Sequence, residues 1–80
     1  MTIVTVYAWT NGMVAVFDDH GQQVPDLQGR LSERKAMILE SAGEDVLFHY
    51  ARWGGEVMRL SRDEFLRLHV DPVGSGTGVV

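Results

Sequence analysis

Apolar positions dominate two short runs near the start of the chain, and a single dipeptide separates them. The runs Ile3–Thr10 and Met13–Asp18 are rich in β-branched and aromatic residues, which favour extended strands. Asn11-Gly12, between them, is a preferred sequence of the two-residue type I′ turn, because both central residues of that turn need a positive φ. The pattern therefore predicts an N-terminal β-hairpin with a two-residue loop.

A two-residue loop fixes the register of this hairpin, and the register sorts its side chains onto two faces. It pairs Trp9 with Val14 and Ala8 with Ala15, and successive side chains point to opposite sides. The face expected to meet the core carries Val4, Val6, Ala8, Met13, Ala15 and Phe17. The opposite face carries Ile3, Thr5, Tyr7, Trp9, Val14, Val16 and Asp18. This second face includes an apolar cluster near the turn, formed by Tyr7, Trp9, Val14 and Val16.

A loop and a helix follow the first hairpin. Pro25 disfavours a central strand within residues 22–29, and Pro25-Asp26 suits the start of a short helical turn. The helix is expected over Ser32–Ala42, with Ser32 as its N-cap and Gly43 just after its end. Its buried stripe consists of Leu31, Lys35, Ile38, Leu39 and Ala42, in which Lys35 is the exception.

The second half of the chain repeats the strand–turn–strand pattern. Val46–Trp53 and Glu56–Leu60 flank Gly54-Gly55, which again favours a two-residue loop. The resulting register pairs Trp53 with Glu56. One face then carries Leu47, His49, Ala51, Trp53, Met58 and Leu60. The other carries Val46, Phe48, Tyr50, Arg52, Val57 and Arg59. We expect the first of these faces to meet the core, because two arginines lie on the other.

A capping box marks the start of the last helix. Ser61 is followed three residues later by Glu64, and the helix is expected to run from Arg62 to about His69, before Asp71-Pro72. The predicted fold is thus α+β in the order β-β-α-β-β-α, with a four-stranded antiparallel sheet from two hairpins and helices on one face. Residues 1–72 form the predicted domain, and residues 73–80, rich in glycine, form a flexible tail.

Composition limits the classes of function. The chain has 80 residues, which is enough for one small domain, and it has no cysteine for a disulfide or a thiolate metal site. Its net charge of −4 argues against a nucleic-acid partner. The sequence shows neither a signal peptide nor a membrane-spanning segment, so we expect a cytoplasmic protein without a membrane partner.

No group of residues has the spacing of an active site or a cofactor site. Asp18, Asp19 and His20 are adjacent, but neighbouring residues on one turn seldom converge on a metal ion, so a solvated turn is the favoured interpretation. Ser32 and Ser61 are better explained as helix caps than as nucleophiles. We therefore expect no enzymatic activity, no metal and no cofactor.

The apolar cluster is the one candidate binding site, and its interpretation stays open. A second layer could cover that face of the sheet. Alternatively the face is exposed and binds a partner, with aromatic residues at its centre and arginines at its rim. Aromatic and arginine side chains on a sheet also describe a single-stranded nucleic-acid platform. The candidate partner-binding residues are Tyr7, Trp9, Val14, Val16, Arg52 and Arg59.

The first third of the chain resembles a group of small phage proteins. Thr5-Val6-Tyr7, then Asn11-Gly12, then Val16-Phe17-Asp18 and Gln28-Gly29-Arg30 follow a pattern seen at the start of small uncharacterised proteins of tailed bacteriophages and prophages. The resemblance implies an accessory protein made in a bacterial cytoplasm, and it carries no activity over to these residues. We expect a non-enzymatic protein that binds a bacterial host protein, such as a component of defence or regulation. A minor virion or assembly protein that self-associates is the alternative, and a single-stranded nucleic-acid binding module is the second alternative.

Overall fold

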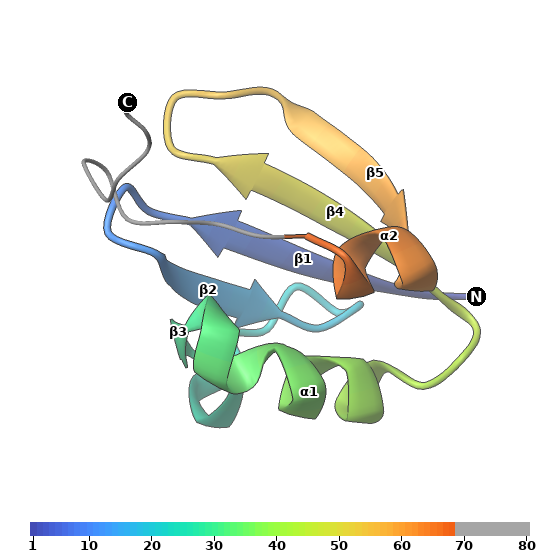
Figure 1. Cartoon of the computed structure of the whole chain (residues 1–80). Helices are drawn as coiled ribbons and strands as arrows, with labels where there is room; N and C mark the ends of the chain where they lie inside the picture. The colour runs from blue at the N-terminus through green and yellow to red at the C-terminus, as the bar shows by residue number, and fades with distance from the viewer. Residues whose placement is uncertain (69–80) are drawn as a thin grey trace.

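Five strands form one mixed sheet in the computed structural model, which describes residues 1–68 (Figure 1). The strands are β1 (Thr2–Ala8), β2 (Met13–Phe17), β3 (Gly29–Arg30), β4 (Val46–Arg52) and β5 (Val57–Ser61). A 3₁₀ turn, η1 (Pro25–Leu27), and two helices, α1 (Leu31–Ala42) and α2 (Arg62–Leu66), complete the described elements. The spatial order of the strands is β3-β2-β1-β4-β5, so β1 is central while β3 and β5 are the edges.

The predicted α+β class is confirmed, but the sheet is not antiparallel throughout. β1 pairs in parallel with β4, from Thr2 opposite Val46 to Ala8 opposite Arg52. The chain crosses from one hairpin to the other through α1, so the two hairpins join side by side along parallel strands. β3 is a fifth strand, and its two residues are too few to produce an alternating pattern. The proposed tail and the Asp71-Pro72 stop lie outside the described residues.

The first hairpin has a three-residue loop instead of the predicted two-residue loop. Ala8 lies opposite Val14, and the loop consists of residues 10–12. The Trp9 N–H donates to the Met13 carbonyl over 2.9 Å, and Gly12 alone has a positive φ, of 85°. Asn11 instead accepts a hydrogen bond from the Met13 N–H, over 3.0 Å, through its side chain. Asn-Gly therefore serves here as a loop whose last residue is left-handed, which is the other common hairpin connection.

This change shifts the predicted register by one residue, so it exchanges the two faces of β2. Val14 and Val16 are 2% and 0% exposed and lie in the core with Val4 and Val6. Ala15 and Phe17 lie on the side of Tyr7. The prediction that Val14 and Val16 form a cluster with Tyr7 and Trp9 is therefore wrong, because the two valines lie on the other face of the sheet.

The second hairpin shows the same one-residue shift. Ala51 lies opposite Val57 and Phe48 opposite Leu60. The Gly55 N–H donates to the Arg52 carbonyl over 2.8 Å, and Gly54 adopts a φ of 76° that a side chain would disfavour. The side chains that β4 contributes to the core cluster are consequently Val46, Phe48 and Tyr50, and the predicted choice of Leu47, His49, Ala51 and Trp53 is wrong, whereas Leu60 lies in the core as predicted.

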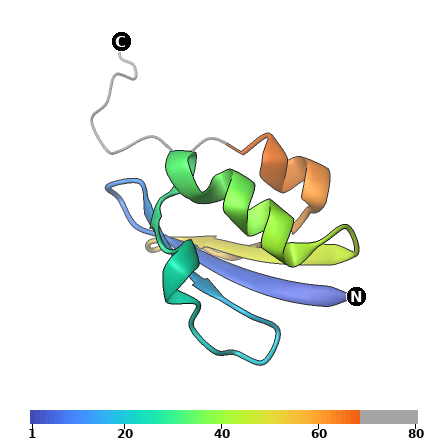
Figure 2. The ribbon, with the colours of Figure 1, turned by 90° about the horizontal axis from the view of Figure 1, so that it is seen from below.

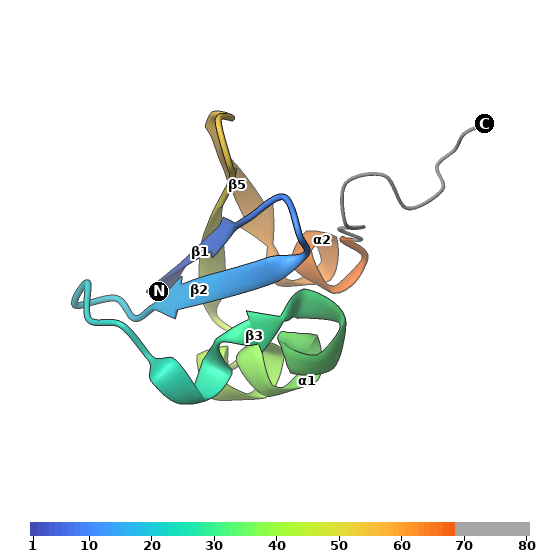
Figure 3. The same ribbon diagram turned by 90° about the vertical axis from the view of Figure 1, so that its left-hand side faces the viewer.

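Both helices pack on one face of the sheet, as predicted (Figures 2 and 3). Phe65 of α2 stacks on Phe48 of β4 with ring centroids 4.1 Å apart. Leu31, Ile38 and Leu39 of α1 are buried against the same layer. Together with the inward residues of β1, β2, β4 and β5, they form a single hydrophobic core.

The helix ends follow the sequence signals in part. The Ser61–Glu64 capping box is present, with the Ser61 N–H donating to Glu64 Oε1 over 2.7 Å, and α2 ends at Leu66. Pro25 opens the expected helical turn, and Gly43 ends α1 with a φ of 79°. Ser32 is not the cap of α1: the helix starts at Leu31, because the β3 residue Arg30 runs directly into it.

Candidate protein-binding face

The sheet face opposite the helices has no covering element within residues 1–68 (Figure 2). We call this surface the open face. Its strand residues follow from the observed registers, and they are Ile3, Thr5, Tyr7, Met13, Ala15, Phe17, Arg30, Leu47, His49, Ala51, Val57, Arg59 and Ser61. None of them is acidic. The open face is thus mainly apolar, with two arginines and a histidine as its ionisable side chains besides Tyr7.

Small neighbours leave Tyr7 standing above the open face. Tyr7 lies opposite Ala15 on one side and opposite Ala51 on the other, and Ala51 in turn lies opposite Val57. The Tyr7 ring meets the Phe17 ring edge-on, with centroids 5.7 Å apart and planes at 83°. This contact supports the tyrosine from one side, while Ala51 leaves a depression on its other side.

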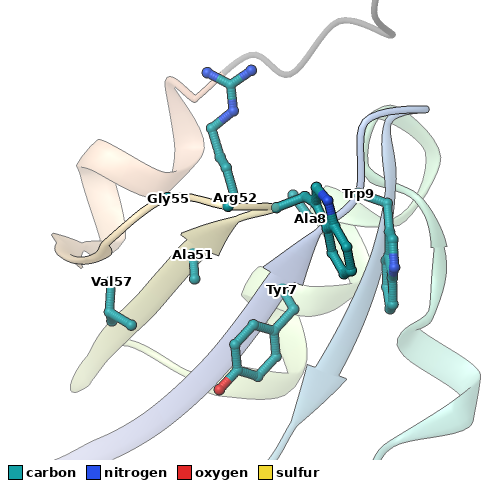
Figure 4. Close-up of a pocket in the computed structure, with 9 residues that line it drawn as sticks. Tyr7, Ala8, Trp9, Ala51, Arg52, Gly55 and Val57 are labelled. Carbon is teal, nitrogen blue, oxygen red and sulfur yellow. The ribbon is translucent and has the colours of Figure 1, made fainter.

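Two tryptophans close this depression at the end of the strands. The Trp53 N–H donates to the Ala8 carbonyl over 2.8 Å, which extends the parallel pairing by one residue and places Trp53 beside Trp9. A hollow of about 310 Å³ lies there, lined by Tyr7, Trp9, Ala51, Trp53 and Val57 together with the backbone of the β4–β5 loop. In Figure 4 the side chains of Tyr7, Trp9, Ala51 and Val57 point to the same side. We call this site the aromatic hollow.

The aromatic residues of the hollow are all exposed to solvent. Tyr7 is 45% exposed, Trp9 43% and Trp53 72%. Large aromatic residues are costly to expose and are enriched at the centres of protein interfaces. Because the strands hold their backbones in register, these side chains can present a preformed surface to a ligand.

The predicted site residues separate into three groups. Tyr7 and Trp9 lie together in the aromatic hollow, and Arg59 lies on the open face opposite His49. Arg52 is among the residues that line the hollow, but its exposed side chain points to the other side of the sheet (Figure 4). Val14 and Val16 are core residues and cannot contact a partner without unfolding.

Trp53 is the site residue that the sequence interpretation missed. The predicted register put it on the core face of the second hairpin, apart from Trp9. The sequence does contain a signal, since Tyr7-Ala8-Trp9 precedes one turn and Tyr50-Ala51-Arg52-Trp53 precedes the other. Only the parallel pairing of β1 with β4 brings the two tryptophans together.

Other candidate groups have structural partners. Asp18 Oδ1 accepts the N–H groups of His20 and Gln22, each over 2.9 Å, and thereby closes its own turn. The Ser61 hydroxyl accepts the Glu64 N–H. Across residues 1–68, no three histidine or acidic side chains lie close enough to share a metal ion. No helix in this part of the chain has the length and apolar character needed to cross a membrane.

The fold and the hollow define a small α+β domain with one covered and one open sheet face. Comparison of the chain with family models, curated proteins and solved structures finds no match.

Proposed function

We propose that the protein is a non-enzymatic binding domain whose open face docks on a protein partner. The observation that carries the proposal is the exposure of Tyr7, Trp9 and Trp53 around one hollow. Tyrosine and tryptophan bury much area and lose little conformational entropy on binding, so they dominate the energetics of interfaces. The phage resemblance of the first third of the chain directs the proposal towards a bacterial host protein made in the same cytoplasm.

A single-stranded nucleic acid is the second candidate partner. Aromatic residues beside Arg59 on an open sheet favour it, since bases stack on such side chains. However, a nucleic-acid backbone needs a groove lined with several cations, whereas the two arginines among the strand residues of the open face, Arg30 and Arg59, lie on opposite edges of the sheet. The protein partner is therefore the better-supported proposal.

The test compares capture of partner proteins from a bacterial lysate by the native chain and by two variants, Trp9→Ala and Trp53→Ala. Each variant should weaken binding by about 2 kcal/mol or more, which is about thirtyfold. Both side chains are exposed, so the fold should survive. Met37→Ala is the matched control, because Met37 is an exposed apolar residue of the helix layer.

Retention of the same partner by both tryptophan variants would contradict the proposed function. Equal loss in Met37→Ala would also contradict it, since the helix layer would then be part of the contact. Retention on single-stranded DNA that falls steeply with salt, without a protein partner, would favour the second candidate.

A further inference from the structure

The edge strand β5 offers backbone groups beside the aromatic hollow. β5 has β4 on one side, and no strand within residues 1–68 pairs with its other side. Protected edge strands usually carry several charged side chains, a proline or a bulge, whereas β5, which reads Val57-Met58-Arg59-Leu60-Ser61, carries a single charge and neither a proline nor a bulge. Val57 and Met58 are exposed on its two faces. β5 therefore has the features of a strand that accepts another strand.

A charged group lies at a defined distance from the hollow along this edge. Val57 lines the hollow, and Arg59 follows on the same face, about 7 Å further along the strand. Arg59 is exposed and forms no ion pair with any other residue between 1 and 68. Its cross-strand neighbour, His49, supplies no negative charge. A ligand along β5 thus meets an apolar site and then a cation.

A second copy of the chain does not satisfy this charge. Two β5 strands related by a twofold axis normal to the sheet would pair antiparallel, with open-face residues opposite one another. Those residues are Gly55, Val57, Arg59 and Ser61, and none carries a carboxylate. Glu56 alternates towards the other face. Arg59 would therefore face an uncharged residue or its own copy, so charge complementarity favours a different chain.

We propose that β5 accepts an extended segment of the protein partner as an additional strand. An apolar side chain of that segment enters the aromatic hollow beside Val57, and a carboxylate two residues away binds Arg59. The backbone supplies affinity, while alternate side chains supply specificity, as in other cases of strand addition. This inference rests on the proposed function and names the chemistry of the partner.

The test uses two synthetic peptides with blocked ends as probes. Each is a run of threonines in which a phenylalanine and a glutamate stand two positions apart, in one order or the other, since the added strand can run in either direction. The peptides contain no tryptophan, and Trp9 and Trp53 are the two tryptophans of the chain. Tryptophan fluorescence therefore reports directly on the hollow during titration. Hydrogen exchange, followed amide by amide, reports on the outer edge of β5.

We expect at least one peptide to change the fluorescence saturably and to protect the amides of β5 that β4 leaves unpaired. Arg59→Glu should weaken binding of that peptide by about fivefold. The same variant should bind more tightly to a peptide in which lysine replaces the glutamate. Arg30→Glu, on the opposite edge of the sheet, is the control and should bind like the native chain.

Three results would overturn the inference. A fluorescence change without protection of β5 means that the hollow binds a side chain but no strand is added. The absence of any change with both peptides means that this partner chemistry is wrong. A dimer in sedimentation that Val57→Lys dissociates assigns the edge to a second copy. The first two results would overturn strand addition but not the proposed function. The proposed function is tested independently, by the capture of partner proteins with the two tryptophan variants.

Discussion

Two tyrosines on opposite faces of the sheet have opposite surroundings. Tyr7 is exposed on the open face and rests against Phe17. Tyr50 is buried on the helix side, and its hydroxyl has no hydrogen-bond partner in the described part of the chain. A buried hydroxyl without a partner lowers stability, because it has lost its hydrogen bonds to water. Tyr50 therefore contributes through its ring and not through its hydroxyl.

Replacement Tyr50→Phe should leave the free energy of unfolding at neutral pH unchanged or raise it by about 1 kcal/mol. The phenyl ring keeps the packing with the core, and the unpaired hydroxyl is removed. Urea unfolding measures the difference. A loss of 2 kcal/mol or more would show that the hydroxyl makes a stabilising hydrogen bond, and it would contradict this account.

The native chain and Tyr50→Phe should also differ in how their stability changes in alkaline solution. Burial raises the pKa of the Tyr50 hydroxyl above its ordinary value of 10.0, against a smaller opposing effect of Arg52. The folded state then holds the proton more tightly than the unfolded state, so native stability falls as the pH rises above 10.0. Tyr50→Phe should lack this part of the loss. If the free energy of unfolding of the two proteins changed in parallel with pH, a raised pKa of Tyr50 would be contradicted.

The two helices stabilise each other's C-terminal ends with cations. Lys35 of α1 donates through Nζ to the carbonyls of Leu66, over 3.0 Å, and Leu68 at the end of α2. Arg62 of α2 donates through Nε to the Gly43 carbonyl over 3.0 Å, at the end of α1. Cations at these ends satisfy free carbonyls and oppose the negative end of the helix dipole. The hydrogen bonds of Lys35 to the end of α2 explain why a lysine interrupts the apolar stripe of α1.

Lys35→Met and Arg62→Met should each lower the free energy of unfolding by about 1 kcal/mol, since they keep the apolar stem and remove the charged donor. Lys35 should have the smaller effect, because burial lowers its pKa and so offsets part of the gain. Glu40→Gln, at an exposed position of α1, is the control. Thermal or urea unfolding measures all three, and native-like stability of both methionine variants would contradict the reciprocal cap.

At the level of elements, the sequence predicts the four longer strands and both helices, but neither the two-residue strand β3 nor the register of the hairpins. Alternation identified both hairpins, and the Ser61–Glu64 box identified the start of α2. Asn11-Gly12 fits both a two-residue and a three-residue loop, and the difference of one residue reverses every side chain of β2. Local chemistry cannot choose between them. The choice depends on burying Val14 and Val16 under the helices, which is a property of the whole fold.

At the level of the molecule, folding and binding use different faces of one sheet. The helices cover Phe48, Tyr50 and the inward valines, while Tyr7, Trp9 and Trp53 stay on the other side. Tyr7 and Trp9 could be predicted as a pair from β1 alone. Trp53 could not, because its place depends on the parallel contact between strands 44 positions apart in the register, such as Ala8 and Arg52. The candidate site is therefore a product of the strand order.

Collisional quenching of tryptophan fluorescence tests the central claim most directly, because Trp9 and Trp53 are the two tryptophans of the chain and both lie in the aromatic hollow. In the free protein, both should be accessible to a neutral quencher such as acrylamide. In complex with a captured partner that lacks tryptophan, or whose tryptophans are replaced, quenching should fall sharply, because the partner covers the hollow. Unchanged quenching in a complex that demonstrably forms would show that the partner binds elsewhere, and it would contradict the account.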